Sequence, residues 1–137
     1  MFIRISTFLL FTFIPLSLCA GEKSVIGKLD PNICFVTSAY SDTSGQFRLV
    51  VTNMGWEHVS SRLSLEWLAE GPKQSWVVEK TVSIKEFDGG MWSTGMPIWS
   101  PEKSEFSLSA THTYSGEEKK FVLKPLAVGK YNLTEIK

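Results

Sequence analysis

The chain has 137 residues, and its 14 basic and 14 acidic side chains give a formal net charge of zero at neutral pH. A chain without net charge lacks the long-range attraction that draws basic proteins to nucleic acid or to anionic lipid, so we expect neither as a partner. The length fits a single globular domain preceded by a short leader.

The first twenty residues have the layout of a secretory signal peptide. Arg4 supplies a positive charge, an apolar run follows, and Ala20 ends a zone of small residues before the charged segment 21–23. Signal peptides contain a core of roughly 7–15 apolar residues, whereas a membrane-spanning helix needs roughly 20. We therefore expect a signal peptide over residues 1–20 and one mature domain over residues 21–137. The mature product should be secreted or periplasmic, without stable membrane insertion.

The two cysteines raise separate questions. The segment that ends at Cys19 is similar to a bacterial lipobox, but Leu18 stands where that motif has Gly, Ala or Ser, so a lipoprotein is the less favoured interpretation. Removal of the leader leaves Cys34 without a partner for an internal disulfide. Within its apolar run, Cys34 is expected to be a buried structural side chain. An intermolecular disulfide or a reactive thiol is the alternative.

The mature chain is predicted to be all-β. Short runs rich in β-branched and aromatic residues alternate with clusters of Gly, Pro, Asn and Ser, and no helical period is present. Residues 89–101 are expected to be irregular. This spacing predicts an antiparallel β-sandwich of about seven strands, of the fibronectin type III or immunoglobulin-like kind. The expected strands cover residues 25–29, 33–40, 47–53, 62–68, 76–87, 106–114, 120–124 and 131–136.

The C-terminal segment 121–133 looks like the corner between two late strands of a fibronectin type III-like domain. Tyr131 would have a structural role there, with its hydroxyl bonded back to the turn. If residues 131–136 are the penultimate strand, the domain lacks its own last strand and exposes an unpaired edge. A homodimer formed by strand exchange or edge pairing would cover that edge. Alternatively, residues 25–29 fill the gap, or the strand count is off by one.

The sequence holds no catalytic constellation. His58 and His112 lack a second ligand at metal-binding spacing, and His112 falls in phase with apolar neighbours, as a partly buried strand residue would. Neither a G-x-S-x-G nucleophile elbow nor a phosphate-binding glycine loop is present. We therefore predict a protein that is not an enzyme and has no metal site and no cofactor.

Large apolar side chains concentrate in a segment rich in Gly and Pro, where loops usually carry polar residues. Protein interfaces concentrate Trp and Met, and a few such anchors dominate binding energy. The alternative is a structured crossover in which Ile98 and Trp99 cover the core and Met91 fills a gap. Trp67, which alternates with leucines, is expected in the core. The candidate protein-binding residues are Trp56, Met91, Trp92, Met96, Ile98 and Trp99.

Three segments together resemble a known family. They are VIGKLDPNICFVTSAY, FRLVVTNMGW and KPLAVGKYNLTEI. With the short leader, this layout is similar to the small secreted interleukin receptor mimic proteins of pathogenic Escherichia coli and its relatives. The resemblance implies a fibronectin type III-like domain, a strand-swapped dimer and a virulence-associated role in binding host cytokine receptors. It carries over no binding residue position by position.

These observations predict an exported, non-enzymatic protein-binding module. Two other functions remain open. One is a subunit of a surface fibre that is completed by a donated strand. The other is a periplasmic enzyme inhibitor that inserts a rigid loop into an active site.

Overall fold

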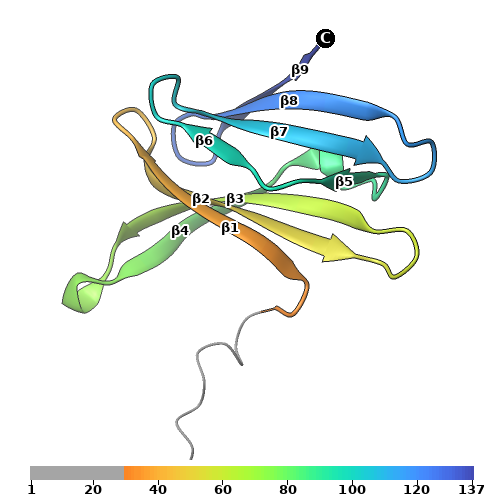
Figure 1. The fold of residues 1–137 in the computed structure, drawn as a ribbon. Coiled ribbons are helices and arrows are strands. Elements are labelled where there is room, and N and C mark those ends of the chain that lie inside the picture. The colour runs from red at the N-terminus through yellow and green to blue at the C-terminus, as the bar shows by residue number, and fades with distance from the viewer. Residues whose placement is uncertain (1–29) are drawn as a thin grey trace, which may run out of the picture.

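The computed structural model describes residues 30–137, which form two antiparallel β-sheets packed face to face (Figure 1). The expected signal peptide and the expected strand 25–29 lie outside the described residues. Sheet A contains, in spatial order, β1 (Ile33–Ser41), β2 (Gly45–Met54), β3 (Ser60–Glu70) and β4 (Trp76–Ser83). Sheet B contains β5 (Trp92–Thr94), β6 (Ile98–Ser100), β7 (Glu105–His112), β8 (Glu118–Pro125) and β9 (Tyr131–Ile136). Two short 3₁₀ helices are η2 (Pro72–Gln74) and η3 (Lys85–Phe87).

The predicted antiparallel β-sandwich is confirmed, whereas its strand connections differ from the fibronectin type III or immunoglobulin-like kind that the sequence predicts. Fibronectin type III and immunoglobulin domains join their strands by Greek-key connections. Here each sheet is built from strands that are consecutive in the chain, and one crossover after β4 joins the two sheets. The sandwich is therefore two successive meanders, with nine strands in place of about seven.

The core lies between the sheets and follows the alternation of the sequence. In β2, β3 and β7 every second residue is buried, because successive side chains of a strand point to opposite faces. Trp67 is 1% exposed, which confirms its expected place in the core. The buried apolar residues are Ala39, Phe47, Leu49, Val51, Leu63, Leu65, Trp67, Ile84, Phe87, Phe106, Leu108, Ala110 and Leu123.

The expectation of an irregular stretch over residues 89–101 is wrong. Two three-residue strands, β5 and β6, form there, and both pair with β7. Pro97 interrupts the ladder between them, since proline has no N–H to donate. Short runs separated by Gly and Pro give no period that could reveal strands of this length.

The expected strand 76–87 is shorter than predicted. β4 ends at Ser83, and η3 follows, with Ile84 and Phe87 buried beneath the crossover. The imperfect alternation in β4 has a structural cause, because the β3–β4 register shifts by one residue between Trp67 and Leu68. Such a bulge changes which side chains face inward.

Cys34 is exposed, so the prediction of a buried cysteine is wrong. The register of β1 against β2 shifts between Ile33 and Phe35, and Cys34 is the extra residue at that irregularity. The Cys34 side chain falls in phase with those of Val36, Ser38 and Tyr40 on the exposed face of β1, because successive side chains of a strand point to opposite faces.

The Tyr131 hydroxyl does not bond back to its own turn, which corrects the expected corner. It accepts a hydrogen bond from the Lys85 backbone N–H at 3.3 Å and donates one to the Glu86 carboxylate at 3.1 Å. Tyr131 therefore links β9 to η3 in the crossover. Burial, together with the Glu86 carboxylate, raises the pKa of the Tyr131 phenol above its ordinary value.

Candidate functional site

The six candidate binding residues do not form one site. They fall into three groups: Trp56 and Met91 lie at one end of the sandwich, and Met96 and Ile98 lie on the outer face of sheet B. Trp92 and Trp99 are partly buried and pack against the core. One segment of sequence thus supplies three different surroundings, because short strands turn successive side chains to opposite faces.

Three connections meet at one end of the sandwich, which we name the loop end. They are the β2–β3 hairpin (residues 54–59), the segment 88–91 and the β7–β8 hairpin (residues 113–117). The two hairpins lie together on the right in Figure 1. The Thr113 N–H donates to the Met91 carbonyl at 2.8 Å. The Thr113 hydroxyl shares its one proton between the Met91 carbonyl at 2.9 Å and the Val59 carbonyl at 3.2 Å. A single residue therefore holds the three connections in place.

Aromatic side chains form a row across the loop end. His58 lies 4.8 Å from the Tyr114 ring, and the rings of Tyr114 and His112 are 6.3 Å apart. His112 packs edge-on against Trp92 at 5.0 Å, and the Lys119 ammonium lies 5.3 Å from the Trp92 ring. The distances suit aromatic and cation–π attraction. The row starts in the partly buried sandwich and ends at exposed Tyr114 and His58.

Trp56 stands at the tip of the β2–β3 hairpin and is 100% exposed. Gly55, with φ of +94°, precedes it, and a side chain at that position would collide with the His58 carbonyl oxygen at 2.5 Å. The backbone therefore needs glycine to make the turn that presents Trp56. Met54, Met91 and Tyr114 are also exposed at this end.

Trp92 and Trp99 face inward. The Trp99 ring lies 5.2 Å from Phe47 and 4.9 Å from Phe106, and it completes an aromatic cluster between the sheets. The alternative prediction that Trp99 covers the core is therefore right. The same prediction is wrong for Ile98, which is 63% exposed.

A shallow furrow of about 290 Å³ crosses the outer face of sheet B. Ser107 and Ser109 on β7 line it together with the larger side chains of Met96, Ile98 and Ile136. The Gly95 N–H donates to the Ser109 carbonyl at 3.1 Å, which holds the β5–β6 link against β7 beside the furrow. Small polar side chains between large apolar ones thus create a hollow on an otherwise flat sheet.

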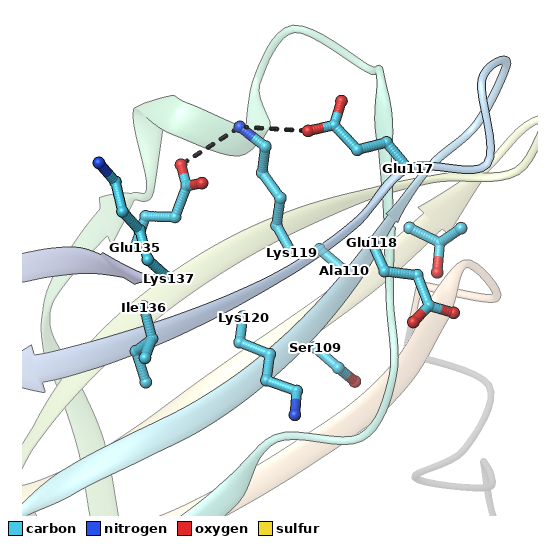
Figure 2. A pocket seen from close by; sticks show the side chains of 10 residues that line it. Ser109, Ala110, Glu117, Glu118, Lys119, Lys120, Glu135, Ile136 and Lys137 are labelled. Carbon is cyan, nitrogen blue, oxygen red and sulfur yellow. Dashed lines mark hydrogen bonds and ion pairs between the residues drawn. The ribbon is translucent and has the colours of Figure 1, made fainter.

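A charged hollow of about 760 Å³ adjoins the furrow where β9 ends. Figure 2 shows Lys119 reaching Glu117 and Glu135, at 3.8 and 3.2 Å. Lys120 points away from these carboxylates and lines both the hollow and the furrow. Among residues 30–137, no ion pair involves Lys120. The furrow is therefore apolar with a cation at its border.

The opposite end of the sandwich also carries exposed apolar side chains. Trp76 opens β4 and is 56% exposed, and the next two residues, Val77 and Val78, are about half exposed. The binding residues predicted from the sequence do not include Trp76, Met54, Tyr114 or Ile136. The sequence could have indicated exposure of Tyr114 and Trp76, because each borders a predicted turn.

Within residues 30–137, no group of three or more His, Cys, Asp or Glu side chains is placed to hold a metal ion. The described part of the chain also has no helix of the length and apolar character needed to cross a membrane. Comparison of the chain with protein-family models, with curated proteins and with solved structures found no match.

Proposed function

We propose that this chain is an exported, non-enzymatic protein-binding module that contacts its partner through the loop end. The observation that carries the proposal is the fully exposed Trp56 on a hairpin that is joined to two other connections. Exposed aromatic anchors on a rigid scaffold are what interface hot spots use. Since a large apolar side chain in water gains roughly 1.5–3 kcal/mol when buried, Trp56 favours a partner that covers it.

The partner class comes from the family resemblance of the sequence, which suggests a host cytokine receptor. A partner of this kind would meet the mature protein after export, because residues 1–20 have the layout of a signal peptide. The loop end suits such a contact, since three linked connections lose little conformational freedom when they bind.

The test is binding of residues 21–137 to a panel of immobilised cytokine-receptor ectodomains. Trp56→Ala should weaken binding at least about tenfold, because loss of a central anchor commonly costs about 2 kcal/mol or more. Trp76→Ala is the matched control, since it removes an exposed tryptophan from the opposite end. Absence of binding across the panel would contradict the receptor proposal. Loss of binding with Trp76→Ala alone would move the surface to the opposite end.

A homodimer through β9 belongs to the same proposal. β9 pairs with β8 over six consecutive positions without a register shift, and its outer edge has no partner strand among the described residues. β1 and β4, the edges of sheet A, both contain register shifts, which hinder pairing with another chain. Sedimentation of residues 21–137 should give a discrete dimer. A monomer at micromolar concentration would contradict it.

The free β9 edge also keeps one alternative function in view. A surface-fibre subunit would accept a donated strand at such an edge and would polymerise. Sedimentation at micromolar concentration separates the two ideas, because a closed dimer keeps one size there while a fibre subunit completed by donated strands forms polymers.

A further inference from the structure

Beyond this proposed function, we infer that the furrow on sheet B binds Trp56 and Glu57 of a second copy of the chain. The contact joins two different surfaces of the molecule. It is therefore heterologous, and repetition of it builds open chains or rings in place of a closed two-fold dimer.

The furrow sets the chemistry of its occupant. Its volume of about 290 Å³ lies just below the range of small-molecule pockets, so it suits one large side chain. Met96 and Ile98 are 62% and 63% exposed, and both would lose water contact under an aromatic ring. Lys120 at the border, without an ion-pair partner among residues 30–137, favours a carboxylate next to that ring.

The described chain contains one aromatic side chain that is fully exposed, Trp56, and the next residue is the exposed Glu57. An aromatic residue followed by an acidic one matches the furrow and the cation at its border. The Trp56 indole would lie between Met96 and Ile98, and the Glu57 carboxylate would meet the Lys120 ammonium. Ser107 and Ser109 in the lining leave room for the ring edge, since their side chains are small.

A single copy cannot make this contact with itself. Trp56 belongs to the β2–β3 hairpin of sheet A. The furrow lies on the face of sheet B that points away from sheet A, because its residues Ser107 and Ser109 alternate along β7 with core residues. The occupant must therefore come from another molecule.

The contact area is small, and the expected dissociation constant is on the order of 100 µM, as for weak interfaces. Sedimentation velocity of residues 21–137 at about 100 µM and above should show species larger than the closed dimer, whereas the dimer alone is expected at micromolar concentration. Trp56→Ala and Ile98→Glu should each abolish this growth. Circular dichroism checks that both variants fold. A wild-type protein of constant size at all concentrations overturns the inference.

Charge reversal gives the sharper test. Glu57→Lys and Lys120→Glu should each weaken self-association about fivefold, as expected for loss of an exposed ion pair. The double variant should restore it, because the two exchanged charges are again opposite across the contact between copies. Lys124→Glu is the matched control, since it makes the same charge change on β8 outside the furrow. Failure of the double variant to recover overturns the pairing of positions 57 and 120.

The two proposals fail separately. Ile98→Glu blocks the furrow and leaves Trp56 free, so receptor binding should persist in this variant. If receptor binding is absent while wild-type growth and charge rescue are present, the proposed function fails and the self-contact stands. If Ile98→Glu still self-associates like the wild type, a site other than the furrow is responsible and the inference is overturned.

Discussion

The two ends of the sandwich carry exposed apolar side chains in different ways. At the loop end, hydrogen bonds of Thr113 join three connections, and Trp56 projects from them without contact to the fold. At the opposite end, Trp76 begins an edge strand and retains partial burial. The sheets meet there through the Ser44 hydroxyl, which donates to the Pro125 carbonyl at 3.0 Å.

Tryptophan has two different roles in this molecule, one in packing and one on the surface. Trp99 contributes to stability because it packs between aromatic rings of both sheets. Trp56 contributes no packing and is available to a partner. The amino-acid composition does not distinguish Trp56 from Trp99. Substitutions whose effects on stability and on binding differ test this distinction directly.

Trp99→Ala should have the largest effect on stability. Loss of the indole leaves a cavity beside Phe47 and Phe106, and aromatic-to-alanine changes in cores cost about 3–5 kcal/mol. Urea unfolding should show a drop in unfolding free energy of about 3 kcal/mol, since Trp99 is partly buried. A loss below about 1 kcal/mol would mean that the aromatic cluster is not part of the core.

Ser61→Ala should have the second-largest effect on stability, because the Ser61 side chain on β3 is fully buried and bonds to β2 and β5. Its hydroxyl donates to the Asn53 side-chain oxygen and accepts the Thr94 N–H, both at 2.8 Å. A buried group left without its partner costs about 1–3 kcal/mol. Chemical denaturation should show a loss of about 2 kcal/mol. A nearly neutral Ser64→Ala, on the outer face of the same strand, is the expected control.

Tyr131→Phe should cost about 1 kcal/mol, because it removes the hydroxyl that links β9 to η3. It should also change the pH dependence. The folded-state pKa of Tyr131 is raised above its ordinary value of 10.0, mainly by burial. Its contribution to stability is therefore present below about pH 10 and is lost as the pH rises through the folded pKa.

Thermal unfolding between about pH 8 and 11 measures this dependence, over the window that brackets the ordinary tyrosine pKa of about 10. Above about pH 10 the wild-type protein should lose stability more steeply than Tyr131→Phe. Parallel curves for the two proteins would exclude a raised pKa at Tyr131.

Trp56→Ala should have the smallest effect on stability, within about 0.5 kcal/mol, as for surface changes that remove no contact. The same substitution should weaken partner binding and self-association. Chemical denaturation measures the stability of the variant, and sedimentation of the same sample measures its self-association. A marked loss of stability would show that Trp56 packs against the fold, and the contrast between the two ends would disappear.

The fold class was predictable from the sequence, since burial of one face of a strand leaves a period of two in the residues themselves. Phe47, Leu49 and Val51 show this pattern, and all three lie in the core. The segment 89–101 could not be resolved in the same way. Its two strands have three residues each, too few to establish a period.

The candidate site shows the same division between local pattern and packing. The residue types alone indicated that Trp56, Met96 and Trp99 differ from ordinary loop residues. Only the tertiary structure decided that Trp56 is exposed, that Met96 borders a furrow and that Trp99 is in the aromatic cluster. The reason is that exposure depends on neighbours distant in the chain: Phe47 and Phe106 cover Trp99, while no part of the described chain reaches Trp56.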